Sequence, residues 1–198
     1  MKLTFIITLI LLGIFVIFQT YIALSTTNTE KQPYTIIQKE KDFEIRFYPS
    51  ATYATINSPA KSYESLANNG FRKLANYIFG GNQEAKQIAM TAPVHMNIND
   101  SLSTMSFVMP ATYNKSTLPL PNDTGVQIKS SSDEYVAAIS FGGFASDNEI
   151  KTYSEKLKKA LTEKSIPFIG NVRYLGYNPP YQLFARRNEL IIQINYEK

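Results

Sequence analysis

The sequence contains no cysteine, only one histidine, and no charged residue between Leu3 and Leu24. The absence of cysteine excludes disulfides and thiolate metal sites. A single histidine makes a Ser-His-Asp triad an unattractive hypothesis, and no GxSxG, HExxH, P-loop or dinucleotide-binding motif is present. The sequence therefore offers no motif of the common hydrolase, metalloprotease or nucleotide-binding classes.

Charge is sparse and mixed in sign. The chain has 20 Lys and Arg against 16 Asp and Glu, a net charge of +4 over 198 residues. Lysine and glutamate alternate through residues 146–164, a pattern typical of a solvated helix face. No basic stripe interleaved with aromatic residues is present, so nucleic-acid binding is not expected.

The uncharged N-terminal run, residues 3–24, is long enough to cross a bilayer, because each helical residue adds about 1.5 Å to a span of about 30 Å. Residues 1–24 are either an uncleaved membrane anchor or a secretory signal with a small-x-small site at Ala23-Leu24-Ser25. We favour the single-pass anchor, since the run is long for a signal. Lys2 then favours an extracytoplasmic domain; cleavage would instead leave a secreted or periplasmic protein.

The remaining chain divides simply. Residues 25–33 are rich in Thr, Asn and Gln, which predicts a polar tether without fixed structure. Residues 34–198 suit one domain of ordinary size.

The stretch from Gly70 to Val94 shows a change from helix to strand. The apolar residues before the Gly80-Gly81 pair recur every three or four positions and predict a helix over 59–79, starting with Ser58 as cap. Its expected buried stripe is Ala67, Phe71, Leu74, Ala75 and Ile78. From Ile88 the period becomes two, which predicts a strand with Met90, Val94 and Met96 facing inward and His95 on the opposite face.

The order of elements repeats along the chain. Alternating segments predict strand 53–57, helix 59–79 and hairpin 88–109, followed by strand 135–141, helix 147–164 and hairpin 172–196. A capping box at Ser146 to Glu149 opens the second helix. The fold class is therefore α+β: a duplicated strand-helix-strand-strand unit forms one antiparallel sheet with both helices on its faces and a groove between the halves.

Several motifs in a fixed order resemble the SOUL haem-binding protein family over about residues 34–196. They are FEIRFY at 43–48, GFRKLANYIFGGN at 70–82, MTAPV at 90–94, FVMP at 107–110, SFGGFA at 140–145, GYNPP at 176–180 and RRNEL at 186–190. The resemblance implies binding of haem or another tetrapyrrole, an apolar planar molecule, in a shallow groove beside the first helix of the domain. It also implies a distorted antiparallel barrel flanked by two helices, and the best understood members of the family have no known enzymatic turnover.

The resemblance also implies a set of site residues. The groove is expected to use the first helix of the domain, the strand after it, and the loop before the last strand: Phe71, Leu74, Ala75, Ile78, Met90, Tyr177, Gln182 and Arg186. Gln182 stands where animal members carry a basic residue that meets the propionates, as do Asn68 and Asn76. Amides at these positions give weaker contacts than charged groups.

Three alternatives stay open. His95 is the only imidazole for haem iron, but its strand parity favours a structural or surface role unless Pro93 introduces a bulge. Glu189 either forms an internal ion pair with an arginine or acts as the base of a hydrolase, as in related folds of the effector-binding type. The domain could also be a non-enzymatic interaction module whose groove holds a partner segment.

Overall fold

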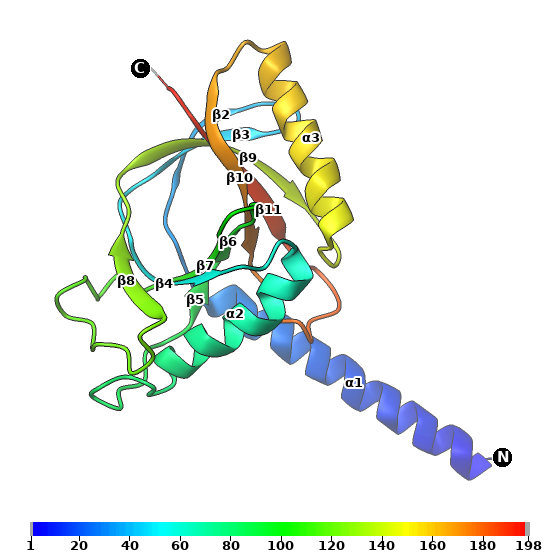
Figure 1. Ribbon diagram of the computed structural model, residues 1–198. Helices are drawn as coiled ribbons and strands as arrows, with labels where there is room; N and C mark the ends of the chain where they lie inside the picture. Colours follow the sequence, from blue (N-terminus) through cyan, green and yellow to red (C-terminus); the bar gives the residue numbers. More distant parts are fainter. Residues whose placement is uncertain (1, 197–198) are drawn as a thin grey trace.

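The computed structural model describes residues 2–196, in which three helices accompany one large antiparallel sheet (Figure 1). The helices are α1 (Lys2–Asn28), α2 (Tyr63–Ile78) and α3 (Asp147–Glu163). The strands are β1 (Glu30–Lys31), β2 (Thr35–Lys39), β3 (Glu44–Tyr48), β4 (Thr52–Ser58), β5 (Thr91–Ala92), β6 (Val94–Asn97), β7 (Ser103–Val108), β8 (Val126–Ser130), β9 (Glu134–Phe141), β10 (Phe168–Gly176) and β11 (Asn188–Ile194).

The large sheet confirms the duplicated unit. Its strand order is β2-β3-β9-β11-β10-β6-β7-β4-β8, in which the triplet β9-β11-β10 lies beside the triplet β6-β7-β4. In both triplets the strand that comes first in the chain is outermost, the second is innermost, and the third lies between them. Each triplet has its helix between its first and second strands in the chain. The sheet is open, with β2 and β8 as its edges, so the barrel form of the expectation is wrong. The antiparallel α+β class is confirmed.

Helix α2 is capped by Ser62 rather than by Ser58 and begins at Tyr63. The Ser62 side chain accepts a hydrogen bond from the Ser65 amide, which satisfies one of the free N–H groups of the first turn. The helix ends at Ile78, and Gly80 then takes a positive φ of 105°, which a glycine adopts without a Cβ clash.

The buried face of α2 is rotated from the predicted stripe. The residues it buries are Leu66, Gly70, Leu74, Tyr77 and Ile78. At Gly70 an added Cβ would lie 3.0 Å from Ile56 Cδ1 and 3.1 Å from Met105 Sδ. Glycine thus lets the helix approach β4 and β7 closely, and the face centred on Gly70 turns Phe71 toward solvent.

Helix α3 follows the sequence prediction. Ser146 caps it by accepting a hydrogen bond from the Glu149 amide and donating its hydroxyl proton to the Glu149 carboxylate. Leu157 and Leu161 are its fully buried residues.

The two faces of the sheet carry different cores. Both helices pack on one face, where Leu74 of α2 and Leu157 of α3 belong to the same apolar cluster. The opposite face carries a smaller cluster that includes Tyr48, Leu175, Tyr177 and Ile191, with Tyr34 packed against it. The second face is therefore covered by the N-terminal segment of the domain.

Residues 25–33 are ordered, contrary to the expected tether. Helix α1 continues to Asn28, and β1 pairs in parallel with β5, Glu30 opposite Thr91. The Gln32 amide also donates to the Ala92 carbonyl at 2.8 Å. The apolar part of α1 projects from the domain and is long and apolar enough to be a candidate membrane span (Figure 1).

Candidate functional site

The apolar surface beside α2 is made by residues that are only partly covered. Phe71 is 36% exposed and Met90 is 42% exposed, while Ala75 is half-buried. Leu74 and Ile78, also expected in the groove, are sealed in the core beneath them. We call Phe71, Ala75 and Met90 the α2 surface.

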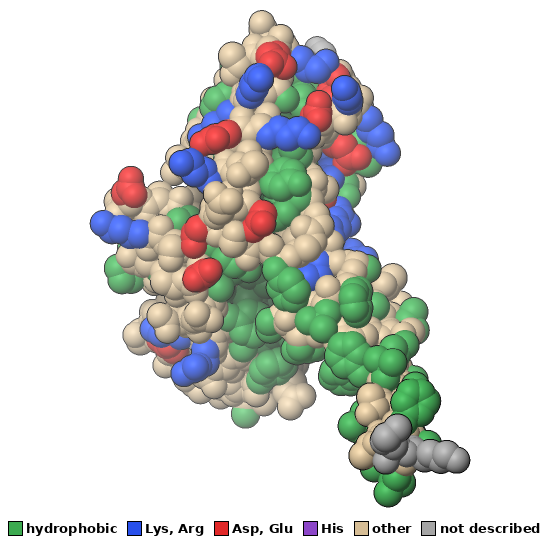
Figure 2. Space-filling view, turned by 90° about the vertical axis from the view of Figure 1, so that its right-hand side faces the viewer, with side chains coloured by type: hydrophobic (Ala, Val, Ile, Leu, Met, Phe, Trp, Pro, Cys, Tyr) green, Lys and Arg blue, Asp and Glu red, His purple; other side chains and the backbone are tan. Residues whose placement is uncertain are grey.

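Phe71 and Met90 lie at the same end of β7. The Phe71 ring is 5.2 Å from the Phe107 ring, measured between centroids. Thr91, which follows Met90, donates its hydroxyl proton to the Val108 carbonyl at 2.5 Å. Figure 2 shows hydrophobic side chains gathered in a hollow of the domain close to where α1 leaves it. Exposed aromatic and thioether groups of this kind suit contact with an apolar planar molecule.

The loop from Tyr177 to Arg187 is engaged with α1. Gln182 is buried, and its Oε1 accepts a hydrogen bond from Thr26 Oγ1 at 2.9 Å. Arg186 Nη1 donates to the carbonyls of Pro179 at 2.8 Å and Gln182 at 2.6 Å, which fastens the loop to itself. Gln182 and Arg186 Nη1 are therefore occupied by internal contacts, whereas Arg186 Nε is buried without a hydrogen-bond partner among residues 2–196.

The opposite face of the sheet holds a buried ionic cluster around Glu189. Arg46 donates two hydrogen bonds to the Glu189 carboxylate, at 2.8 and 3.0 Å, and Arg187 donates two more, at 2.7 and 3.1 Å. The hydroxyls of Tyr177 and Ser140 add bonds of 2.8 and 2.9 Å. Glu189 has no exposed surface. Both carboxylate oxygens therefore accept hydrogen bonds from donors within the domain.

Electrostatics in this cluster favour the carboxylate anion. Burial alone would raise the pKa of Glu189, but the hydrogen bonds and positive charge of Arg46, helped by Arg187, hold that pKa below its usual range. Burial and the adjacent Glu189 charge raise the pKa of Tyr177. The internal ion pair is therefore the arrangement found, and Glu189 lacks the access and proton affinity of a general base.

His95 lies opposite Met96 in strand parity, as predicted, but it is not at the surface. The N-terminal segment covers it: its Nε2 lies 2.7 Å from Gln32 Oε1, and its ring meets Tyr53 edge-on at 5.3 Å. Burial and the positive charge of Arg173 lower the pKa of His95 to about 3. Burial thus favours the neutral form of this imidazole, which lies on the face of the sheet opposite Met96.

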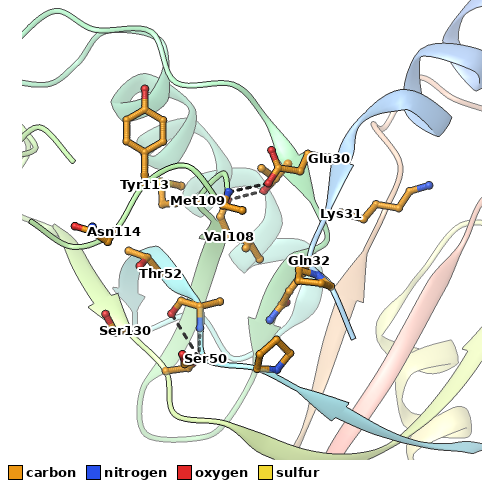
Figure 3. Close-up of a pocket in the computed structure, with 16 residues that line it drawn as sticks. Glu30, Lys31, Gln32, Ser50, Thr52, Val108, Met109, Tyr113, Asn114 and Ser130 are labelled. Carbon is orange, nitrogen blue, oxygen red and sulfur yellow. Dashed lines mark hydrogen bonds between the residues drawn. The ribbon is translucent and has the colours of Figure 1, made fainter. Parts of the chain in front are cut away.

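A cavity of about 400 Å³ lies elsewhere, between the N-terminal segment and the ends of β4, β7 and β8 (Figure 3). Its lining includes Gln32, Thr52, Met109, Tyr113 and Ser130. In Figure 3 the Glu30 side chain reaches across its rim, where Oε1 accepts a hydrogen bond from the Ala111 amide at 2.7 Å. None of the expected site residues lines this cavity.

Residues 29–193 match the profile of the family described as SOUL heme-binding protein. The chain belongs to the SOUL family. It is 30% identical over 174 residues to heme-binding protein 2 of Mus musculus, covering 83% of this chain and 84% of that protein. It is 32% identical over 162 residues to heme-binding protein 2 of Homo sapiens, covering 77% of this chain and 78% of that protein.

Solved structures with a similar fold are distant in sequence. The EcmrR C-terminal domain superposes with a TM-score of 0.59 at 8% identity, covering 83% of this chain and 99% of that domain. A hydrolase from Listeria innocua superposes with a TM-score of 0.57 at 7% identity, covering 80% of this chain and 94% of that chain. At these identities the similarity concerns the fold of this SOUL-family chain alone.

The α2 surface offers apolar side chains and few groups that could ligate a metal. Among residues 2–196 there is no group of three or more His, Cys, Asp or Glu placed to hold a metal. Arg72 and Lys73 are exposed on α2, so two cationic side chains lie on the same helix as Phe71. Met90 offers an exposed thioether.

Sequence reasoning anticipated an ion pair between Glu189 and an arginine, but it missed Arg46 as a partner of Glu189 and Gln32 as the partner of His95. Arg46 is 143 positions from Glu189, and Gln32 is 63 positions from His95. Two signals were present in this SOUL-family sequence: Arg187, two positions before Glu189, and Arg46, a charge inside an alternating strand at residues 43–48. No spacing rule connects Arg46 to a carboxylate so far along the chain.

Proposed function

We propose that this chain binds haem or another tetrapyrrole on the α2 surface and is tethered to a membrane by α1. Membership of the SOUL family and the names of its relatives supply the ligand class. The observation that carries the site is the partial exposure of Phe71 and Met90 at one end of β7. A planar macrocycle lying on this surface would remove both side chains from water, and apolar burial contributes about 25 cal/mol per Å².

The residues that would hold the ligand have distinct tasks. Phe71 and Ala75 would contact the ring face, and Met90 would close one side. Arg72 or Lys73 would meet propionates, although Lys73 Nζ also lies 3.8 Å from Asp123 Oδ2. That ion pair is exposed, so its exchange for a propionate costs little.

The tether rests on the length and composition of α1. The helix Leu3–Asn28 is long and apolar enough to cross a membrane, and little of its most apolar part is buried against the domain. An apolar helix that is left this exposed needs a lipid environment or removal by a signal peptidase. We propose the first, with the domain on the extracytoplasmic side.

A spectral titration of the full chain in detergent micelles tests the ligand and the site. Haem and metal-free porphyrin are each titrated into the wild type and two variants. Phe71→Ser removes the aromatic contact from the α2 surface, and Ser130→Phe places a ring at the cavity of Figure 3 as a matched control. We expect Phe71→Ser to lower affinity about tenfold, or about 1.4 kcal/mol, and Ser130→Phe to leave it unchanged. The reverse pattern would move the site to the cavity, and no saturable binding by wild type would overturn the function.

A further inference from the structure

We infer that residues 177–187, the loop between β10 and β11, together with Phe144 form a second membrane contact, which rests in the bilayer interface beside α1. The inference depends on the proposed tether and goes beyond it, since a tether alone leaves the domain free to tumble. The loop and the turn around Phe144 belong to the second half of the domain, whereas the α2 surface belongs to the first.

The loop is fastened to α1 at three points. Gln19 Nε2 donates to the Tyr181 carbonyl at 3.1 Å, and Gln19 Oε1 accepts from the Leu183 amide at 3.0 Å. Seven residues further on, Thr26 bonds to Gln182 at 2.9 Å. These contacts span about 10 Å of helix length. Ile22, between them, is buried.

The contact at Gln19 places the loop at membrane depth. Gln19 lies inside the apolar run that ends at Leu24, about 8 Å before its end at 1.5 Å per residue. A glutamine amide in hydrocarbon requires hydrogen-bond partners. The loop backbone supplies both, and Gln19 is buried. If α1 spans the bilayer, the backbone of Tyr181 and Leu183 therefore lies at the boundary between acyl chains and headgroups.

The side chains that this loop exposes suit that boundary. Tyr181 is 59% exposed, Phe184 is 65% exposed, and Leu183 and Phe144 are also exposed. The loop has no Asp or Glu, and it carries Arg186, whose guanidinium lies 4.4 Å from the Phe144 ring centroid. Aromatic and aliphatic side chains combined with arginine are typical of protein surfaces at the headgroup level.

Among the possible partners of these exposed apolar side chains, the geometry favours the bilayer. Figure 2 shows hydrophobic side chains along α1 and again on the domain close to the base of the helix, with other side chains and backbone between them. A soluble partner would have to approach along the same side of α1 that the bilayer surrounds. The lipid surface is already present there once the helix inserts.

The absence of tryptophan from the chain makes a direct test simple. Phe184→Trp introduces one fluorophore at the loop tip, and Ile169→Trp introduces one at the start of β10. Ile169 is 45% exposed, and the start of β10 lies at the end of the domain far from α1 (Figure 1). Each full-length variant is reconstituted into phosphatidylcholine–phosphatidylglycerol vesicles that carry a spin-label quencher near the headgroup or at the acyl-chain end.

We expect Trp fluorescence of Phe184→Trp to be quenched about twofold more strongly by the shallow label than by the deep one, as befits an interfacial side chain. Ile169→Trp should respond to neither label and to aqueous iodide instead. Flotation of the vesicles shows whether the protein is inserted.

The outcomes separate the two proposals. Protein that floats with the vesicles while Phe184→Trp behaves like Ile169→Trp overturns the loop contact and leaves the tether intact. Protein that does not float overturns the tether and the loop contact together. Haem binding in micelles is measured separately and is independent of either result.

Discussion

Arg46 of β3 and Glu189 of β11 are joined across the intervening strand β9 by two hydrogen bonds, from Nη1 to Oε2 at 2.8 Å and from Nη2 to Oε1 at 3.0 Å. The pair is almost fully buried. Tyr34, in the segment leading from α1, adds its ring 4.3 Å from the Arg46 guanidinium and accepts a hydrogen bond from Arg187. The cluster therefore ties three strands and the N-terminal segment together, which is a structural task.

Glu189→Gln should lower stability and spare ligand binding. The substitution leaves two arginine side chains facing a neutral amide, and breaking a buried ion pair costs about 3 kcal/mol. The midpoint of chemical unfolding in detergent should fall accordingly, while the haem affinity of the folded protein stays unchanged. Glu155→Gln, on the exposed side of α3, serves as the control and should leave both the unfolding midpoint and the haem affinity unchanged. Unaltered stability with loss of a hydrolytic activity would instead make Glu189 catalytic.

Stability should decrease in mild acid because of His95. Its pKa is about 3 in the folded state and about 6.5 when unfolded, so the unfolded chain binds a proton that the folded one excludes. The stabilisation is complete above pH 6.5 and is lost as pH falls toward 3. Between pH 6 and pH 5 the free energy of unfolding should fall by about 1 kcal/mol.

The carboxylate effects lie mainly below this window, since the pKa values of Glu189, Glu40 and Asp42 are lowered from ordinary values of 4.5 or below. His95→Asn should therefore flatten the slope between pH 6 and pH 5. If the free energy of unfolding of this variant still falls between pH 6 and pH 5, a group other than His95 takes up the proton on unfolding.

Haem binding should not require His95. The imidazole is buried on the face opposite Met96 and occupied by Gln32, so it is not available to iron at the α2 surface. Haem and iron-free porphyrin should bind with affinities within about tenfold, or about 1.4 kcal/mol, and His95→Asn should leave the Soret band in place. A shifted Soret band with intact porphyrin binding would show that His95 reaches the iron.

Leu74→Asp should unfold the domain, whereas Phe71→Asp should fold and lose ligand. Leu74 has no exposed surface, and an unpaired carboxylate there costs several kcal/mol, whereas Phe71 can turn a carboxylate toward water. Circular dichroism melts of both variants distinguish the two positions. Equal stability of the two proteins would mean that α2 presents a different face to the sheet.

The N-terminal segment should remain on the mature protein. Mass spectrometry of the membrane fraction should find residues 1–24, and alkaline carbonate should fail to extract the chain. Recovery of a protein that begins near Thr26 from a membrane-free fraction would identify residues 1–24 as a signal peptide.

The sequence by itself determined the features whose causes are local. The cap of α3 needs only Ser146 and Glu149, three residues apart, and the membrane candidate needs only an uncharged run. The duplicated order of strands and helices followed from periods of two and 3.6, because each element must bury one face. The family resemblance rested on motifs that lie within single elements and their turns.

Tertiary structure decided which faces are covered and by what. Strand parity placed His95 opposite Met96, but only the folded chain shows that Gln32 and Tyr53 cover that face. The face of α2 was set by the close approach of Gly70 to β4 and β7, which turned Phe71 outward. Arg46 and Glu189 met through sheet pairing across 143 positions. The periodicity of a segment shows which of its side chains share a face. Which other segment packs against that face depends on contacts between distant parts of the chain.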